Sequence, residues 1–168
     1  MAKGTGTLYY SWEAEGISMN GTVKEEDNFL SVRRSFFDRN GNVLTSNNFK
    51  QNDLIVVRMA LSSKDKSSVE NVVLTDMLPA GFEIENPRLN DLSEMNWITN
   101  ASTPEYFDIR DDRINMFVTA TSNTRYYYYI VRAVSTGKFK LGPCSADAMY
   151  NGEYHSYNGS GTITVTAK

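Results

Sequence analysis

The fold of this chain is decided by residues 125–150, RYYYYIVRAVSTGKFKLGPCSADAMY. The stretch opens with four tyrosines and β-branched residues, which favour a pleated, half-buried surface and would crowd their χ1 angles in a helix. It breaks at Ser135-Thr136-Gly137, continues through residues 138–141, and breaks again at Gly142-Pro143. This pattern predicts a long strand, a tight turn, a second strand and a loop.

Side-chain alternation assigns the two faces of the first of these strands. One face carries Tyr126, Tyr128 and Ile130, and the other carries Tyr127, Tyr129, Val131 and Ala133. Neither face becomes polar before Arg132, so we expect the strand to lie centrally in its sheet. The tyrosine hydroxyls are expected to reach the rim, where they find hydrogen-bond partners.

Composition places the chain among ordinary globular proteins. It has 168 residues, 40% hydrophobic and 22% charged, which suits one domain plus a flanking arm. It has no apolar run long enough to span a bilayer. The net charge of −3 and the pI of about 5.2 provide no basic footprint for nucleic acid. The single cysteine, Cys144, excludes an intrachain disulfide and leaves the compartment open.

Strand patterns recur along the rest of the chain, at residues 5–14, 29–38, 53–62, 70–77, 82–85, 106–109, 114–119 and 161–167. Asn40-Gly41 predicts a hairpin turn, because Asn-Gly supplies positive φ angles. The loosely helical spacing of residues 89–101 predicts a short helix or an irregular crossover. We therefore predict an all-β fold, an antiparallel two-sheet β-sandwich over residues 27–168, preceded by an arm at residues 1–26.

The titratable residues do not form a catalytic set. His155 lies in a polar, loop-like segment without a patterned nucleophile, which favours a surface or capping role. Cys144 has neither a cationic neighbour nor a helix amino terminus to activate it, so we expect an inert thiol, buried or half-buried. No phosphate-binding loop, dinucleotide fingerprint, zinc spacing or nucleophile elbow occurs. The sequence predicts a protein that is not an enzyme and needs no cofactor or metal.

An acidic group at Glu105, Asp108, Asp111 and Asp112 could suggest a cation site. Calcium loops, however, place oxygen ligands at alternate positions around a glycine, whereas Arg110 and Arg113 are interleaved here. An ion-pair network that holds a hairpin tip is the better interpretation.

Three stretches occur together in a fixed order. The first is VLTDMLPAGFEIENP at residues 73–87, which includes Asp76, Leu78, Pro79 and Gly81. The second, residues 106–113, ends in Arg110-Asp111-Asp112-Arg113, and the third, residues 129–150, ends in Ala148-Met149-Tyr150. Together they resemble the carboxy-terminal macroglobulin-like domain of bacterial alpha-2-macroglobulins. The resemblance covers residues 29–168, and residues 6–10 look like the last strand of the domain that precedes it in that family.

The resemblance implies one part of a large protease trap that is exported to the periplasm or cell envelope as a membrane-anchored lipoprotein. In the family, a protease cleaves a bait region, and a Cys-Gln thioester in a separate helical domain becomes exposed and captures it. The terminal domain packs on that thioester domain and keeps water out through a Met-Tyr pair, which corresponds to Met149 and Tyr150. Its partners are then the other domains of the same protein, with target proteases engaged indirectly. The motif residues of the first two stretches are structural in this interpretation.

Other interpretations stay open. The chain has no Cys-x-Glu-Gln sequence, so the thioester is not in these residues, and some family members have lost it. In that case the domain is a structural and interdomain contact module. A cell-surface or adhesin β-sandwich is the alternative, supported by the bend at residues 78–82. Carbohydrate binding through tyrosines or Trp97 would need a coplanar aromatic platform. The chain itself is predicted to be a monomer or a dimer that exchanges its arm through an unpaired edge.

Overall fold

A computed structural model describes residues 4–16, 23–65, 68–85 and 95–168, which contain strands, turns and bends but no helix. The strands are β1 (Glu26–Asn28), β2 (Leu30–Phe37), β3 (Asn48–Lys50), β4 (Leu54–Ser63), β5 (Val69–Met77), β6 (Phe82–Ile84), β7 (Tyr106–Ile109), β8 (Arg113–Ala120), β9 (Arg125–Ala133), β10 (Gly137–Leu141), β11 (Cys144–Ala148), β12 (His155–Asn158) and β13 (Gly161–Thr166). The predicted all-β fold is therefore confirmed. Within the described ranges, no helix could cross a membrane.

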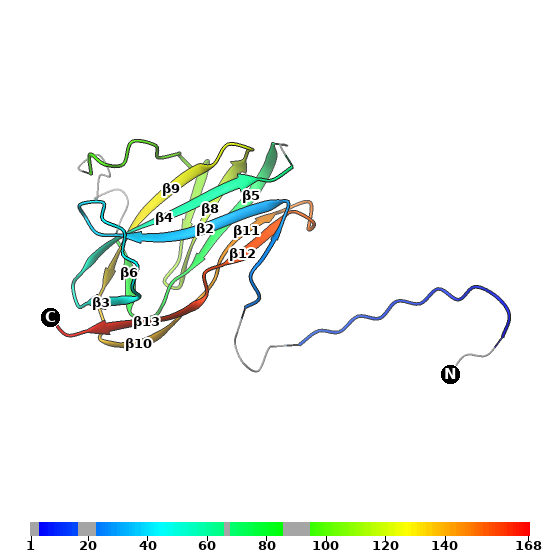
Figure 1. The fold of residues 1–168 in the computed structure, drawn as a ribbon, viewed down its shortest axis with the longest axis horizontal. Helices are drawn as coiled ribbons and strands as arrows, with labels where there is room; N and C mark the ends of the chain where they lie inside the picture. Colours follow the sequence, from blue (N-terminus) through cyan, green and yellow to red (C-terminus); the bar gives the residue numbers. More distant parts are fainter. Residues whose placement is uncertain (1–3, 17–22, 66–67, 86–94) are drawn as a thin grey trace.

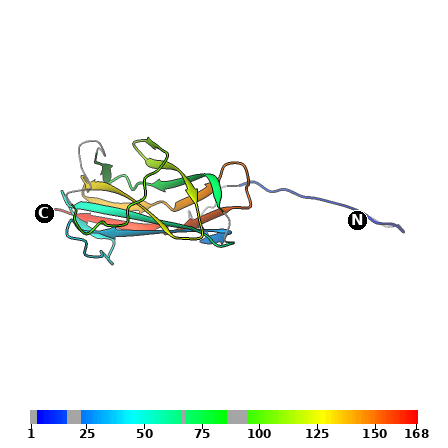
Figure 2. The same cartoon turned by 90° about the horizontal axis from the view of Figure 1, so that it is seen from above.

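The strands form two layers (Figures 1 and 2). A six-stranded sheet has the order β1-β12-β11-β5-β8-β7, and a four-stranded sheet has the order β2-β4-β9-β6. A third, smaller sheet has the order β10-β13-β3. The two larger sheets enclose one hydrophobic core, to which β2, β4 and β9 contribute from one layer and β5, β8 and β11 from the other. The named strands pair antiparallel, except that β13 and β3 are parallel.

The tyrosine-rich strand β9 lies between β4 and β6, as predicted for a central strand. Its faces alternate as expected. Tyr127, Tyr129 and Val131 lie in the main core, while Tyr128 and Ile130 lie in a second cluster on the outer face of the sheet. Met95, Trp97 and Ile98 cover that second cluster. Both faces of β9 are apolar because each of them is buried under a different part of the chain.

One long hairpin crosses from the small sheet to the large one. Leu141 pairs with Gly161 and Cys144 pairs with Asn158, so the register continues unchanged across the break at residues 142–143 and 159–160. The small sheet is thus a continuation of the six-stranded layer (Figure 1). The loop predicted after Gly142-Pro143 is instead strand β11, because its alternating residues bury one face against the core.

Two other predictions differ from the structure. Residues 5–14, predicted as a strand, are extended and exposed without a ladder partner in the described residues, and they run away from the sandwich (Figures 1 and 2). An isolated strand has no second strand to pair with, so its sequence pattern alone does not make a ladder. Of the segment predicted as a helix or crossover, residues 89–94 lie outside the described residues, and residues 95–101 form turns and an isolated bridge.

We predict that Gly142→Ala destabilises the chain by about 2 kcal/mol, because an added Cβ would overlap the Cβ of Met77 at the break between β10 and β11. Urea denaturation measures the loss. Gly161→Ala is the matched control in the same hairpin, since nothing lies within 4 Å of its added Cβ. Its effect should stay within about 0.5 kcal/mol. Equal losses in the two variants would contradict this packing explanation.

Candidate interdomain contact site

The turn between β11 and β12, residues 149–154, presents two apolar side chains to solvent. Met149 is 52% exposed and Tyr150 is 83% exposed. The turn is closed by backbone bonds: Ala148 N donates to Tyr154 O at 2.9 Å, and Tyr154 N donates to Asn151 O at 3.0 Å. The side chains therefore project from an ordered turn at one end of a two-layer sandwich.

A bulge in β5 contacts this turn through a backbone hydrogen bond. Met149 N donates to the carbonyl of Asn71 at 3.0 Å, and the register of β5 against β8 shifts between Val69 and Val72. Asn71 has a φ of 55°, in the left-handed region that asparagine tolerates better than most residues. The bulge turns a carbonyl toward the turn, and that carbonyl holds Met149 in place.

An aromatic stack supports the other side of the turn. The rings of Phe29 and Tyr154 lie 4.9 Å apart with an interplanar angle of 30°. The hydroxyl of Tyr154 donates to Asp65 Oδ2 at 2.6 Å. Phe29 is itself 41% exposed and has a φ of 57°, which is rare for a bulky residue. The apolar side chains at this end thus include Phe29 as well as Met149 and Tyr150.

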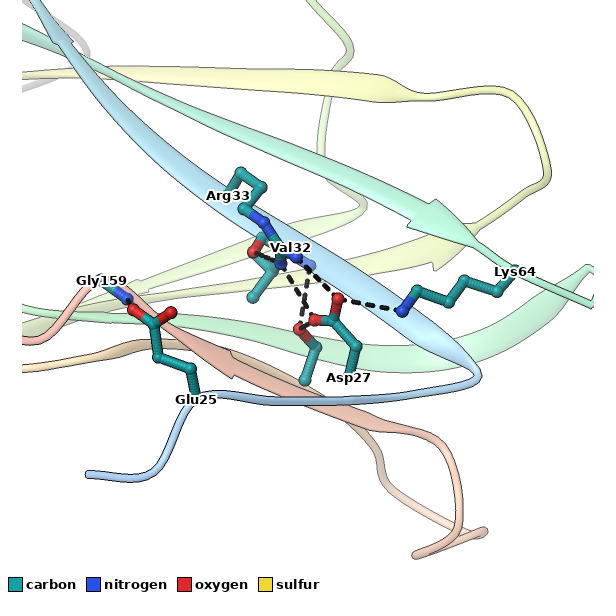
Figure 3. A network of polar contacts seen from close by, with 7 residues as sticks. Glu25, Asp27, Val32, Arg33, Lys64 and Gly159 are labelled. Atoms are coloured by element: carbon teal, nitrogen blue, oxygen red, sulfur yellow. Dashed lines mark hydrogen bonds and ion pairs between the residues drawn. The ribbon is translucent and has the colours of Figure 1, made fainter.

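A polar network attaches β1 beside this end of the sandwich, and we call it the Asp27 cluster (Figure 3). The carboxylate of Asp27 accepts hydrogen bonds from Arg33 Nη2 at 2.7 Å, Lys64 Nζ at 3.0 Å and Ser156 Oγ at 2.6 Å. The buried hydroxyl of Ser156 also accepts the amide of Val32 at 3.0 Å. The hydrogen bonds from Arg33 hold the pKa of Asp27 well below its usual range, although burial opposes them. The cluster is charged at physiological pH.

Asp76 takes part in a second, buried network at the centre of the sandwich. Asp76 on β5 pairs with Arg34 on β2, and the Asp76 and Arg34 side chains are 1% and 3% exposed. The hydroxyl of Tyr129 on β9 donates to Asp76 Oδ2 at 2.6 Å. Burial and the Asp76 carboxylate raise the pKa of Tyr129, so its hydroxyl stays protonated and donates. The tyrosine hydroxyl expected at the rim is thus found between the layers.

Arg34 uses its remaining donor capacity on backbone carbonyls. Its Nη2 donates to Gly142 O at 2.9 Å and to Gly159 O, and these carbonyls lie at the breaks where the long hairpin changes sheets. Burial opposes the guanidinium charge, but the Asp76 carboxylate, together with Cys144 and Tyr129, raises the pKa of Arg34. The network joins both layers and both breaks through one charge pair.

The bend motif at Leu78, Pro79 and Gly81 lies at the other end of β5. Leu78 N donates to Asp112 O at 2.9 Å, and Val134 N donates to Gly81 O at 2.8 Å. An added Cβ at Gly81 would overlap the ring of Phe139, so a larger residue would displace that ring. The structure places these residues in contacts between loops, away from Met149 and Tyr150.

The turn at Arg110-Asp111-Asp112-Arg113 joins β7 to β8 at this same far end. Arg110 Nε lies 3.0 Å from Asp108 Oδ1, and Arg113 Nη2 lies 2.6 Å from Asp112 Oδ2. Arg110 N donates to Arg113 O at 2.9 Å and closes the turn. In the described ranges, no group of three His, Cys, Asp or Glu side chains could hold a metal ion.

The remaining candidates have local contacts. His155, predicted in a loop, lies in β12, where its Nδ1 is 2.9 Å from Gly152 O. Cys144 is buried, and burial raises the pKa of its thiol to about 12. Trp97 packs against Phe37 and Tyr128 with ring centroids 5.2 Å and 6.1 Å away, so it does not form the platform that carbohydrate binding would need.

Taken together, these groups do not bring a nucleophile, a base and an oxyanion donor to one point. What the described residues do present is an apolar, well-supported turn on a rigid β-sandwich. Fold and site therefore define a β-sandwich domain that presents an exposed apolar turn.

Comparison with known proteins gives the family. Residues 30–153 match the family described as Bacterial Alpha-2-macroglobulin MG10 domain. An alpha-2-macroglobulin of Xylella fastidiosa (strain 9a5c) is 30% identical over 170 residues, covering 95% of this chain and 10% of that protein. The alpha-2-macroglobulin of Escherichia coli (strain K12) is 26% identical, covering 85% of this chain and 9% of that protein. The chain belongs to the bacterial alpha-2-macroglobulin MG10 domain family, and it spans about a tenth of the length of these relatives.

Solved structures agree on the fold. Escherichia coli alpha-2-macroglobulin activated by porcine elastase superposes with a TM-score of 0.77 at 22% identity, over 84% of this chain and 13% of that chain. A fragment of native Escherichia coli alpha-2-macroglobulin, from domain MG7 to the carboxy terminus, gives a TM-score of 0.74 at 21% identity, over 86% of this chain and 24% of that chain.

Sequence reasoning missed several residues at the site. In the sequence, Asp27 falls at the boundary between the predicted arm and the predicted sandwich, and Phe29 at the start of a predicted strand. The positive φ of Phe29 and its stacking on Tyr154 leave no signature in one sequence, because both depend on residues far away in the chain. The Ser156 hydroxyl was not singled out either, although a serine between two aromatic residues in a predicted all-β chain could have indicated a buried hydroxyl.

We predict that Tyr129→Phe costs about 2 kcal/mol, because it removes a buried donor to a charged acceptor and preserves the ring. Tyr128→Phe is the matched control on the same strand: its hydroxyl donates to the neutral Asn100 Oδ1 at 2.9 Å. The control should lose about 1 kcal/mol or less. Urea unfolding of both variants tests the difference, and a larger loss in Tyr128→Phe would refute the assignment of the buried network.

We also predict that the Cys144 thiol does not react with dithionitrobenzoate in the folded chain, because its pKa of about 12 leaves almost no thiolate at neutral pH and the side chain is buried. In denaturant, one thiol should react rapidly. Fast reaction of the native chain would show that β11 opens readily.

Proposed function

We propose that this chain is the domain of a bacterial alpha-2-macroglobulin that packs on the thioester domain of the same protein. In this role Met149 and Tyr150 keep water away from the thioester until a protease cleaves the bait region. The observation that supports the proposal best is the exposure of this pair on a turn that is held by Asn71 of β5, Ala148 of β11 and the ring of Phe29.

The chemistry of the pair suits this role. A thioester hydrolyses when water and nucleophiles reach it, so an apolar cover lengthens its lifetime. The phenol ring provides a broad, rigid cover, and the thioether of Met149 fits irregular gaps. Because Met149 is 52% exposed, burying the rest of its side chain contributes about 1 kcal/mol of contact free energy. The cover is held by moderate apolar contacts, so a domain movement can withdraw it.

Two related proteins support this order of events. Escherichia coli alpha-2-macroglobulin is described as activated by porcine elastase, and Salmonella alpha-2-macroglobulin as reacted with methylamine. We extend both reactions to the parent protein of this chain, with the domain near its carboxy terminus and the protein exported to the periplasm or cell envelope. Residues 1–26 then include the last strand of the preceding domain and a linker. If the parent has lost the thioester, the same turn serves as an interdomain contact only.

The test uses the full-length parent protein. Tyr150→Ala should raise the rate of thiol release by methylamine at least tenfold, because small nucleophiles then reach the thioester. Dithionitrobenzoate follows the reaction, and buried Cys144 should add no background. Tyr106→Ala is the matched control, since Tyr106 is also exposed, at 63%, but lies on β7.

Two results would reject the shielding role. One is an equal rate in Tyr150→Ala and the unmodified protein. The other is an equal acceleration by Tyr106→Ala, which would indicate general loosening of the domain.

A further inference from the structure

We propose that β1, with the Asp27 cluster and Phe29, couples the chain before residue 23 to the order of the β11–β12 turn. When β1 is docked on β12, the turn is held; when β1 is drawn away, Tyr154 loses its stacking partner and the turn loosens. This coupling is a property of the present chain. Its consequence for a thioester rests on the proposed function.

The pairing of β1 places it directly beside the turn. β1 pairs antiparallel with β12, with Asn28 opposite His155, the residue that follows Tyr154. Among the described strands, β12 is the one with which β1 pairs. Phe29 then forms a bridge to His155 and stacks on Tyr154. Strand β1 is therefore followed at once by a residue that contacts the last residue of the turn.

The Asp27 cluster makes the docking of β1 a single event. Its donors come from β2, from the loop after β4 and from β12, so one carboxylate joins four parts of the chain (Figure 3). If β1 leaves, Arg33 and Lys64 lose their shared carboxylate, and buried Ser156 loses its acceptor. Ser156 is fully buried, so the loss of its acceptor is the costly step, whereas the half-exposed Arg33 and Lys64 can bind water instead. We expect partial undocking to be rare and full undocking to release all three donors together.

The backbone of Phe29 adds a second reason for coupling. A bulky residue in the left-handed region is strained, and such strain persists only while surrounding contacts hold it. Here those contacts are the stack on Tyr154 and the bond from Lys64 N to Phe29 O at 2.8 Å. Once β1 is free, Phe29 can return to an extended conformation, which moves its ring away from Tyr154.

The arm precedes β1 in the chain, so a neighbour that binds the arm could draw β1 away from β12. Residues 4–16 are exposed and extend away from the sandwich, with apolar side chains at Leu8, Tyr10 and Trp12. Glu25, just before β1, contacts the sandwich through Gly159 N at 3.1 Å.

Hydrogen exchange measured by NMR on the 168-residue chain tests the coupling. In Asp27→Asn, the amides of Met149 and Tyr154 should exchange at least tenfold faster, while the amide of Met59 in β4 reports global unfolding. Asp108→Asn is the matched control: Asp108 also pairs with an arginine, Arg110 at 3.0 Å, but lies at the far end of the sandwich. It should leave the Met149 and Tyr154 amides unchanged.

The coupling is overturned if Met149 and Tyr154 in Asp27→Asn exchange as in the unmodified chain, or if their acceleration only matches that of Met59. If Asp27→Asn does not fold, Lys64→Met removes one donor of the same carboxylate and should give about a threefold acceleration; a folded Lys64→Met chain without acceleration overturns the proposal.

The same substitution separates this inference from the proposed function. In the full-length parent, Asp27→Asn should also raise thiol release by methylamine. Faster exchange at the turn without faster thiol release supports the coupling and contradicts the shielding role. Unchanged exchange overturns the coupling, whatever Tyr150→Ala does to thiol release.

Discussion

The arrangement of this domain depends on the buried charge pair between Arg34 and Asp76. Breaking such a pair by removing one partner costs about 3–5 kcal/mol, because an uncompensated charge remains in the interior. The pair is satisfied only when Tyr129 also reaches Asp76 and when the carbonyls of Gly142 and Gly159 face Arg34. These partners come from β2, β5, β9 and the two breaks of the long hairpin. A slip of one residue in any of these strands would move a partner to the other face, so the network selects one register.

The two ends of strand β5 lie at opposite ends of the domain, and the side chains around them differ in chemistry. At its carboxyl end, the bend at Leu78 and the turn at Asp112 are joined by backbone bonds and surrounded by ion pairs. Near its amino end, the bulge at Asn71 contacts Met149, and apolar side chains remain exposed. The two ends are about 20 Å apart along the strand. At the carboxyl end of β5, the loops contact one another. At the amino end, the exposed apolar side chains form a surface that a neighbour can bury.

The sequence predicts the architecture well because local patterns reflect local structure. The alternation in residues 125–133 gives the faces of β9 correctly, and the absence of helical periodicity gives the all-β class. It does not predict that residues 144–148 form a strand, because Gly142-Pro143 indicates a stop, whereas the hairpin continues past it in the same register. The sequence predicts less of the candidate site than of the fold. Met149 and Tyr150 were singled out through a family resemblance, and Asp76 was recognised as a motif residue without its partners. Arg34 lies 42 residues from Asp76 and Tyr129 lies 53 residues from it, so no local pattern links them.

Two exposed apolar stretches of this chain are connected through one short strand. The arm at residues 4–16 precedes β1, and the turn at residues 149–154 precedes β12, the strand on which β1 docks. Exposed tyrosine and tryptophan in the arm, and exposed methionine and tyrosine in the turn, cost solubility in an isolated domain, so their presence is easier to understand if each stretch is buried against a different neighbour. The charged Asp27 cluster lies between these stretches and tolerates water better than an apolar joint would. β1 contributes no residue to the hydrophobic core, and the network of Arg34, Asp76 and Tyr129 that joins the layers does not include it. The domain thus combines a core fixed in one register with an edge strand that can respond to its neighbours.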